Sequence, residues 1–150
     1  YGLYFVGGKT HVDNHTLVDN VQTNCFSNQL YKGIAGGNST AVFNGKIYVK
    51  QAAQKTNAYQ SNKNITISPT ATINAKPQLE IFADDVKCSH GCTIGQLDEE
   101  SLFYLRSRGI PEKTARAILI RAYAMDVLEH VKPVALKDYV DKIINEKLIN

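Results

Sequence analysis

The stretch KPQLEIFADDVKCSHGCTIGQLDEESLFYLRSRG, residues 76–109, contains the point at which the chain changes character. In LEIFA, residues 79–83, the aliphatic side chains occupy every second position, as in a strand that buries one face. Further on the spacing becomes helical, with Asp98 as a good N-cap and Gly109 where a helix favours a left-handed terminal residue. The stretch therefore predicts a β region followed by an α region.

The residues before this stretch indicate many short strands. Runs rich in β-branched and aromatic residues alternate with Gly, Asn and Ser clusters, without helical spacing between them. Asn44-Gly45 between two runs suggests a tight hairpin turn, although the same dipeptide also suits corners that need positive φ. Strands this short allow a sandwich, a barrel or a coiled β-solenoid, and no fixed period decides among them. The runs are YGLYFV at 1–6, STAVF at 39–43, KIYVK at 46–50 and NITIS at 64–68.

The last third of the chain predicts three helices. Pro111 can open the second helix at its first turn, and Lys132-Pro133 can end it. The domains expected are an all-β core over residues 1–97 and a helical domain over residues 98–150. The apolar positions that define the second and third helices are Ala115, Ile118, Leu119, Ala122, Met125 and Leu128, then Leu136, Tyr139, Val140, Ile143, Ile144 and Leu148.

Length and charge exclude several classes of protein. A chain of 150 residues, 43% hydrophobic and 21% charged, can form one globular domain with a small appendage. A net charge of +3 is too small to predict binding to nucleic acid or a membrane surface. No apolar run approaches the roughly 20 residues that a membrane helix needs. Because Tyr1 lies inside an expected strand, we expect a fragment of a longer protein.

The arginines lie only in the second half of the chain, where two predicted helices and a Gly-Ile-Pro turn resemble a DNA-binding helix-turn-helix. Residues 76–150, however, contain 11 positive and 12 negative side chains, so no basic field is present. The helical hairpin is therefore predicted to bind protein.

Cys25, Cys88 and Cys92 make an odd number of cysteines, which argues against a disulfide framework and for a reducing compartment, the cytoplasm. Three glycosylation sequons begin at Asn14, Asn38 and Asn64, but such matches arise easily in an Asn-rich chain.

The hexapeptide KCSHGC, residues 87–92, is the main candidate site. On a strand Cys88, His90 and Cys92 would face the same way, and thiolate and imidazole are ligands for zinc or iron. A structural zinc site needs four ligands, and no fourth is evident. The alternatives are a complete metal site, one completed by another chain, and small core side chains around a hydrogen-bonded histidine. A Cys-His hydrolase is disfavoured, because such residues lie about 7 Å apart along a strand.

Two further sets of polar residues are predicted to have ordinary structural roles. His11, Asp13 and His15 alternate and predict one solvated strand face, with metal binding as the alternative. Asp84 and Asp85 could suggest the paired acids of a carbohydrate-active enzyme, but adjacent residues on a strand point to opposite faces, so a turn is predicted.

The run from residue 76 to residue 122 closely resembles the SufB/SufD family of the SUF iron–sulfur cluster assembly machinery, on its SufD side. HTLVDN at 15–20, KGI at 32–34 and VFNGKIYV at 42–49 are similar to the same family. The resemblance implies a mainly β fold: a right-handed parallel β-helix, or single-stranded solenoid, followed by a small C-terminal α-helical domain. It also implies that Asn44-Gly45 forms a solenoid corner.

The resemblance implies a non-catalytic scaffold subunit. It would pair with SufB through the β-helix cores, anchor the ATPase SufC and help iron acquisition and nascent cluster formation. ATP would act through SufC, since this chain has no G-x-x-x-x-G-K-[ST] loop. The cluster would be transient in the complex, and no cofactor is expected on the isolated fragment. Because the family shares KCSHG, the cluster-assembly candidates, shared with SufB, are Cys88 and His90; Cys92 replaces the usual alanine.

Residues 98–131 are expected to dock SufC. No nucleic acid or membrane is expected as a partner, and the truncated fragment could self-associate because its coil end exposes unpaired backbone groups. A β-solenoid carbohydrate-active enzyme and a purely structural interaction module are the alternative functions. The candidate docking side chains are Leu102, Tyr104, Arg106, Arg108, Ile118 and Tyr123.

Overall fold

The computed structural model describes residues 1–149 and divides into two compact units. One unit is Gly2–Gly95, and the other begins at Gln96 and also includes Tyr1. The first consists of strands and the second of helices.

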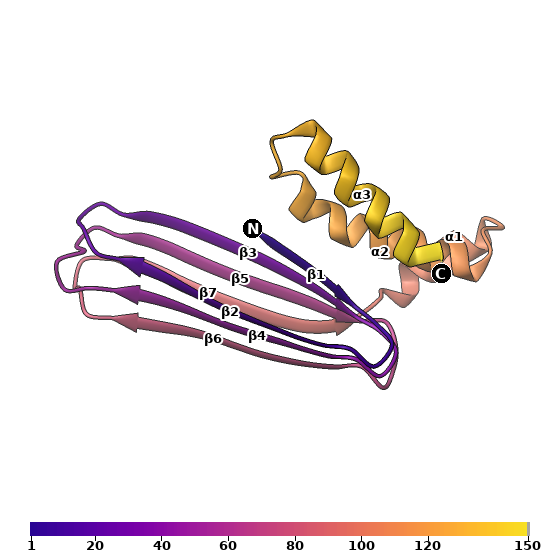
Figure 1. Cartoon of the computed structure of the whole chain (residues 1–150), viewed down its shortest axis with the longest axis horizontal. Coiled ribbons are helices and arrows are strands. Elements are labelled where there is room, and N and C mark those ends of the chain that lie inside the picture. Colours follow the sequence, from indigo (N-terminus) through magenta and orange to yellow (C-terminus); the bar gives the residue numbers. More distant parts are fainter. Residues whose placement is uncertain (150) are drawn as a thin grey trace. The chain divides into compact units, whose positions relative to one another are not determined.

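The strand unit is a parallel β-solenoid, which confirms the predicted fold class and excludes the sandwich and the barrel. The pairs β1–β3, β2–β4, β3–β5 and β4–β6 are parallel, and successive strands along the chain alternate between two sheets. One sheet has the order β1-β3-β5-β7 and the other β2-β4-β6, so the two appear in Figure 1 as layers whose arrows point in opposite directions. The strands are β1 (Gly2–Val6), β2 (His11–Asn20), β3 (Phe26–Ala35), β4 (Thr40–Val49), β5 (Asn57–Thr66), β6 (Thr72–Ile81) and β7 (Lys87–Gln96).

The coils repeat in space without a fixed period in sequence. Gly2 lies beside Tyr31, whereas Thr40 lies beside Thr72, so the chain length per coil varies. The variation arises in the corners, since residues 36–39 join β3 to β4 while residues 67–71 join β5 to β6. This variation explains why periodicity alone did not predict the solenoid.

Inside the solenoid, apolar side chains gather towards the two rows of corners. One cluster contains Tyr4, Val6, Ala35, Ala41 and Ile73, and the other is built from Ile47, Val49, Ala53, Ala58 and Ala83. Between them the inward positions of β3 and β5 carry amides. Gln29, Gln60, Asn62 and Asn64 are buried there, and Gln60 Nε2 donates to Gln29 Oε1 at 2.6 Å. The solenoid therefore has a polar middle layer.

The predictions for Asn44-Gly45, a hairpin turn or a solenoid corner, are both wrong. The two residues lie in the middle of β4, where Gly45 is buried and faces the interior. A Cβ atom at Gly45 would lie 2.6 Å from Gln60 Nε2 and from the ring of Phe43. The glycine is thus present to leave room for a buried amide, and not to turn the chain. The runs STAVF and KIYVK are one strand.

The corners use other residues. Gly8, Gly37, Asn24 and Lys55 have positive φ, and Asn24 N donates to Gln54 O at 2.9 Å in the neighbouring corner. Asp84 and Asp85 lie in the turn between β6 and β7, as predicted. His11, Asp13 and His15 are exposed on alternate positions of β2, which confirms the predicted solvated face.

The helical unit contains α1 (Glu99–Ser107), α2 (Glu112–Leu128) and α3 (Val134–Ile149). Asp98 is the N-cap of α1 and accepts from Ser101 N at 2.9 Å, and Gly109 has φ of +85°, both as predicted. Pro111 is the N-cap of α2, one position before the expected first turn.

The buried faces of the helices differ from the predicted stripes. Ile118 and Ala122 are exposed, as are Leu136 and Tyr139 on α3. The spacing of apolar residues indicated a helix correctly but assigned its inner face only in part, because several apolar residues of this unit remain on the surface. The side chains that α2 buries are Ala115, Ile120, Ala124, Val127 and Leu128.

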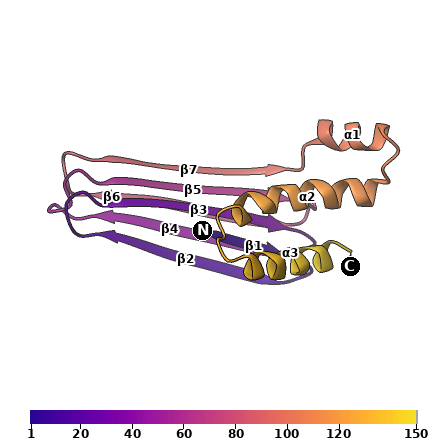
Figure 2. The same ribbon diagram turned by 90° about the horizontal axis from the view of Figure 1, so that it is seen from above.

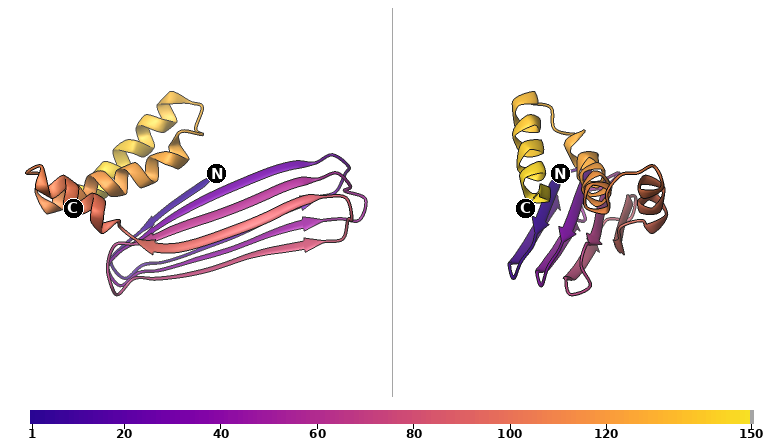
Figure 3. Two further views of the ribbon diagram at one scale, coloured as in Figure 1. Left: turned by 180° about the vertical axis from the view of Figure 1, so that it is seen from behind. Right: turned by 90° about the vertical axis from the view of Figure 1, so that its right-hand side faces the viewer.

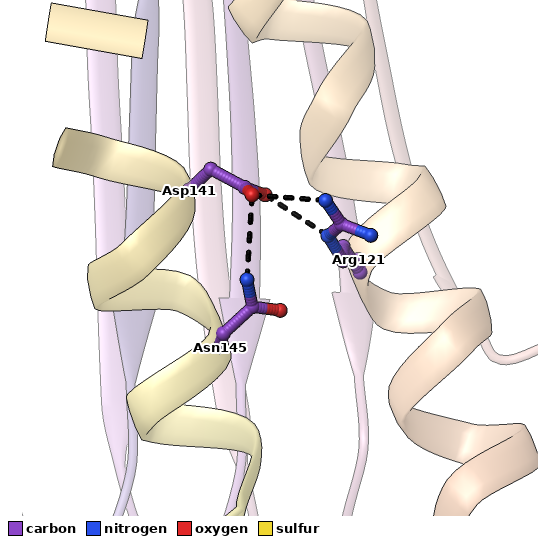
Figure 4. A network of polar contacts seen from close by, with 3 residues as sticks. All are labelled: Arg121, Asp141 and Asn145. Atoms are coloured by element: carbon purple, nitrogen blue, oxygen red, sulfur yellow. Dashed lines mark hydrogen bonds and ion pairs between the residues drawn. The ribbon is translucent and has the colours of Figure 1, made fainter. Parts of the chain in front are cut away.

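A polar contact joins α2 to α3 (Figure 4). Arg121 donates from Nε and from a terminal nitrogen to the two carboxylate oxygens of Asp141, both at 2.9 Å, and Asn145 Nδ2 donates to the same carboxylate at 3.3 Å. The hydrogen bonds from Arg121 hold the pKa of Asp141 below its usual value. Two parallel bonds fix the geometry of the pair better than a single contact would.

None of the helices in the described part of the chain is long and apolar enough to span a membrane.

Candidate functional site

The three candidate side chains lie on β7, the last strand of its sheet. In the sheet order β1-β3-β5-β7, β7 has β5 on one side and no further described strand on the other (Figure 2). In the second sheet, β2-β4-β6, the last strand is β6. The view from behind in Figure 3 follows β7 along its whole length beside β5. This end of the solenoid is thus an open coil with an unpaired strand edge.

Cys88 faces the interior at one end of β7. It is half-buried and packs against the apolar cluster that contains Ala58 and Val49. Burial raises the pKa of the Cys88 thiol, an effect partly opposed by a hydrogen bond with the backbone of Ala58. Because a metal binds the thiolate, a metal at Cys88 would have to displace a proton.

Cys92 faces the same interior four residues further along. Its Sγ donates to Oδ1 of Asn62 at 3.6 Å, within the distance expected for a thiol donor. Cys92 itself is exposed while Asn62 is fully buried, so the thiol lies at the boundary between the polar middle layer and solvent. Desolvation raises the pKa of this thiol as well.

His90 lies between the two cysteines and, by the alternation of a strand, faces the same way. His90 lies beside Gln60 of the neighbouring strand β5, because Lys87 N donates to Thr56 O and Cys92 contacts Asn62. The side chain is exposed because no described strand covers it. The structure therefore places Cys88, His90 and Cys92 on one face, in a row along the open coil.

The row is not a complete metal site by itself. Among the described residues no group of three or more His, Cys, Asp or Glu side chains is close enough together to hold a metal ion. The distance along the strand explains this, because alternate residues are about 7 Å apart. Any ion bound here would need donors from another molecule.

The six predicted docking side chains on the helices do not share one environment. Leu102 is only 3% exposed and packs inside the helical unit, so it presents little surface to a partner. Tyr104 and Ile118 are exposed, as are Arg106 and Arg108. Tyr123 is half-buried.

Tyr104 and Ile118 line the same groove between α1 and α2, which has a volume of about 510 Å³. Leu105 and Leu119 contribute its remaining apolar walls, and Asp98 and Glu100 add negative charge. Arg106 lies elsewhere, in a second depression with Glu112, to which it is bound at 3.5 Å. Arg108 stacks over the Tyr104 ring at 5.3 Å.

Sequence reasoning missed the residues behind β7. In the sequence, Asn62 and Asn64 are two of many asparagines in an expected strand region, and Tyr4 is one of several aromatic residues. Their signal was the alternation of Gln60, Asn62 and Asn64, which puts three amides on one strand face. Only the coil packing shows that this face is the interior.

Comparison with known proteins identifies the family. The family described as "SUF system FeS cluster assembly, SufBD core domain" matches residues 1–123, which is most of the chain. The chain belongs to the SufBD family. The solenoid and the row on β7 are thus features of a SufBD protein. The family match does not support the alternative prediction of a carbohydrate-active enzyme.

Named relatives agree with this assignment. The chain is 43% identical over 136 residues to the iron–sulfur cluster assembly protein SufD of Escherichia coli, covering 91% of this chain and 32% of that protein. It is 42% identical over 147 residues to a SufBD family protein of Synechocystis, covering 98% and 32%. It is 48% identical over 104 residues to the chloroplastic protein ABCI7 of Arabidopsis thaliana, covering 69% and 22%. The chain thus spans about a third or less of these relatives.

Proposed function

We propose that this chain is the part of a SufD-type scaffold subunit that presents the open coil end to SufB and the helices to SufC. The observation that carries the proposal is the row of Cys88, His90 and Cys92 on an unpaired edge strand. An unpaired edge can add a strand from another chain, and the row then lies at the shared interface. Iron and sulfide are the substrates of this site, and the subunit itself performs no catalysis.

The chemistry of the row suits a shared site. Thiolate and imidazole bind iron, and two or three donors on one strand leave coordination positions for ligands from SufB. Both thiols have raised pKa values from burial, so they stay protonated until iron displaces the proton. The three free cysteines suit a reducing compartment, for which we propose the cytoplasm.

The test is anaerobic cluster reconstitution on the full-length protein co-purified with SufB and SufC. We expect His90→Ala and Cys88→Ala to lose the visible absorbance of the cluster and its bound iron and sulfide while the complex stays intact. His15→Ala and Cys25→Ala are the matched controls, because His15 is exposed on the outer face of β2 and Cys25 lies in a corner. Unchanged cluster content in both site variants would indicate that the chain acts only as a scaffold.

That reduced role is the second candidate function, a purely structural interaction module. The packing of Cys88 against an apolar cluster favours it, since a cysteine in such a position can serve as a small core side chain. The two functions differ at His90, which is exposed and contributes little packing.

For SufC we propose docking on residues 98–131, through the groove between α1 and α2. An apolar groove with exposed aromatic and aliphatic side chains is suited to binding a helix or loop of a partner. Tyr104→Ala and Ile118→Ala should each weaken co-purification with SufC, whereas Tyr139→Ala, a change at an exposed tyrosine on α3, should not. ATP hydrolysis would then belong to SufC. Full retention of SufC by the two groove variants would move the interface elsewhere.

A further inference from the structure

One buried amide oxygen beside the row on β7 has no donor. Gln60 on β5 is 3% exposed, and its Nε2 donates to Gln29 Oε1 on β3 at 2.6 Å. Its own Oε1 is buried and accepts no hydrogen bond from any residue that the structure describes. A buried carbonyl without a donor is costly, and such atoms are rare in folded proteins. A donor for this oxygen is therefore expected close by.

The neighbours of Gln60 fix the direction of its amide. The nitrogen points towards β3, where it meets Gln29 Oε1, and it lies over Gly45, where a Cβ atom would come within 2.6 Å of it. If the amide turned over, its oxygen would face the oxygen of Gln29, and the two would repel each other. Because the oxygen and the nitrogen lie on opposite sides of the amide carbon, the oxygen points away from β3. The strand on that side is β7.

His90 is the side chain with a donor that faces Gln60 from β7. The two residues are neighbours on adjacent strands, and both occupy inward positions. On β6 the residue beside Gly45 is Pro77, which has no hydrogen-bond donor. On β2 the residue beside Gly45 is Thr16, which belongs to the coil of β3, the side towards which the amide nitrogen points. The imidazole is therefore the best-placed donor for the amide oxygen.

The cysteines on either side of His90 each contact their own neighbour on β5. Cys88 makes a hydrogen bond with the backbone of Ala58, and the Cys92 thiol donates to Asn62 Oδ1 at 3.6 Å. Both thiols thus have acceptors of their own. A contact between His90 and the amide oxygen at its own level would complete the series along the strand.

We propose that Gln60 is a positioning residue for His90: its Oε1 accepts a hydrogen bond from His90 Nδ1–H, which leaves Nε2 unprotonated and directed out of the open coil. Nδ1 is as many bonds from Cα as the amide carbon of Gln60, so the two groups meet at the same depth on neighbouring strands. His90 is exposed, so its side chain is free to rotate between rotamers and make this contact. The hydrogen bond made by one ring nitrogen decides which nitrogen carries the proton.

The unprotonated nitrogen is the one that can bind a metal. A neutral imidazole binds through its lone pair, and a hydrogen bond to the other nitrogen fixes the orientation of the ring. Because no described strand lies beyond β7, Nε2 faces the side from which SufB would supply further ligands. This use of Nε2 rests on the proposed function, whereas the hydrogen bond between Gln60 and His90 does not.

The test is the tautomer of His90, measured by proton–nitrogen NMR of the full-length, iron-free protein labelled with the heavy nitrogen isotope at histidine only. The pH is held about two units above the ordinary histidine pKa, so that the ring is neutral. The His90 signal is assigned by its loss in His90→Ala. An exposed histidine without a fixed partner favours the Nε2–H tautomer, whereas we expect Nδ1–H at His90.

Variants of Gln60 identify the acceptor. Gln60→Met keeps the length of the side chain but removes the amide, so the ratio of Nδ1–H to Nε2–H at His90 should fall about tenfold, the effect of one ordinary hydrogen bond. Gln60→Asn keeps an amide that is too short to reach His90. It should give the same change, and it replaces Gln60→Met if that variant does not fold. Ile73→Val is the control for general loosening of the coil, because Ile73 packs in an apolar cluster that does not include Gln60.

The outcomes separate this inference from the proposed function. The Nε2–H tautomer in the wild-type protein, or an unchanged ratio in a folded Gln60 variant, would overturn the positioning role of Gln60. A change of the same size in Ile73→Val would also overturn it, because the ratio would then follow loosening of the coil. None of these results would alter the reconstitution result for His90→Ala. Unchanged cluster content in His90→Ala would in turn refute the role of Nε2 towards iron and leave the hydrogen bond to Gln60 standing.

Discussion

Replacement of Gly45 by alanine tests the account of the solenoid interior most directly. A new Cβ would lie 2.6 Å from Gln60 Nε2 and from the Phe43 ring, a separation that real Cβ atoms do not show. Phe43 is fully buried, and Gln60 is held by its 2.6 Å bond to Gln29, so neither neighbour can yield without loss. Overpacking of this kind costs about 1–3 kcal/mol. The lower entropy of an unfolded alanine returns about 0.4–1 kcal/mol. The expected result is a net loss of about 1–2 kcal/mol of unfolding free energy.

The assay is equilibrium unfolding by urea, followed by far-ultraviolet circular dichroism and by hydrogen exchange of peptides from β4 and β5. Gly91→Ala on β7 is the matched control, because nothing lies within 4 Å of a Cβ atom there. It should leave stability unchanged or slightly higher. Protection in β4 and β5 should fall in Gly45→Ala alone. Equal stability of the two variants would show that Gly45 is not required for packing and would refute the role assigned to the buried amides.

Two further predictions concern ionisable groups. Because Arg121 depresses the pKa of Asp141 in the folded state, the pair stabilises the helical unit above the ordinary aspartate pKa of about 4 and loses this effect as pH falls through the depressed value. The melting temperature of Asp141→Asn should therefore lie below that of wild type near pH 7 and converge with it in strong acid; a constant difference would argue against the pair. Burial raises the pKa of Cys88, so its alkylation near pH 8 should be slower in the folded protein than in urea, and equal rates would contradict the packing of Cys88.

The local signals that proved correct depend on few residues. The N-cap at Asp98 and the left-handed Gly109 follow from backbone groups that a helix end leaves unpaired, and these needs do not vary with tertiary context. The shared face of Cys88, His90 and Cys92 likewise needs only strand alternation.

Asn44-Gly45 shows where local signals fail. The dipeptide has the composition of a turn, yet it lies in the middle of β4. Gln60 of the facing sheet packs against Gly45 there. Leu102 shows a related limit, because its spacing indicated a helix face but not whether that face was covered. In both cases the deciding contact comes from another segment of the chain.

The sequence by itself determined the order of a β region and an α region, the helix ends, the row on β7 and, through its motifs, the SufBD family. Only the tertiary structure decided which residues form the corners, that the middle of the coil is polar and that Tyr4 reaches Asn64 across Gly33. The physical reason is that strand alternation and capping act over a few residues, whereas coil stacking joins positions about 30 residues apart through corners of unequal length. Such contacts produce no fixed period in the sequence.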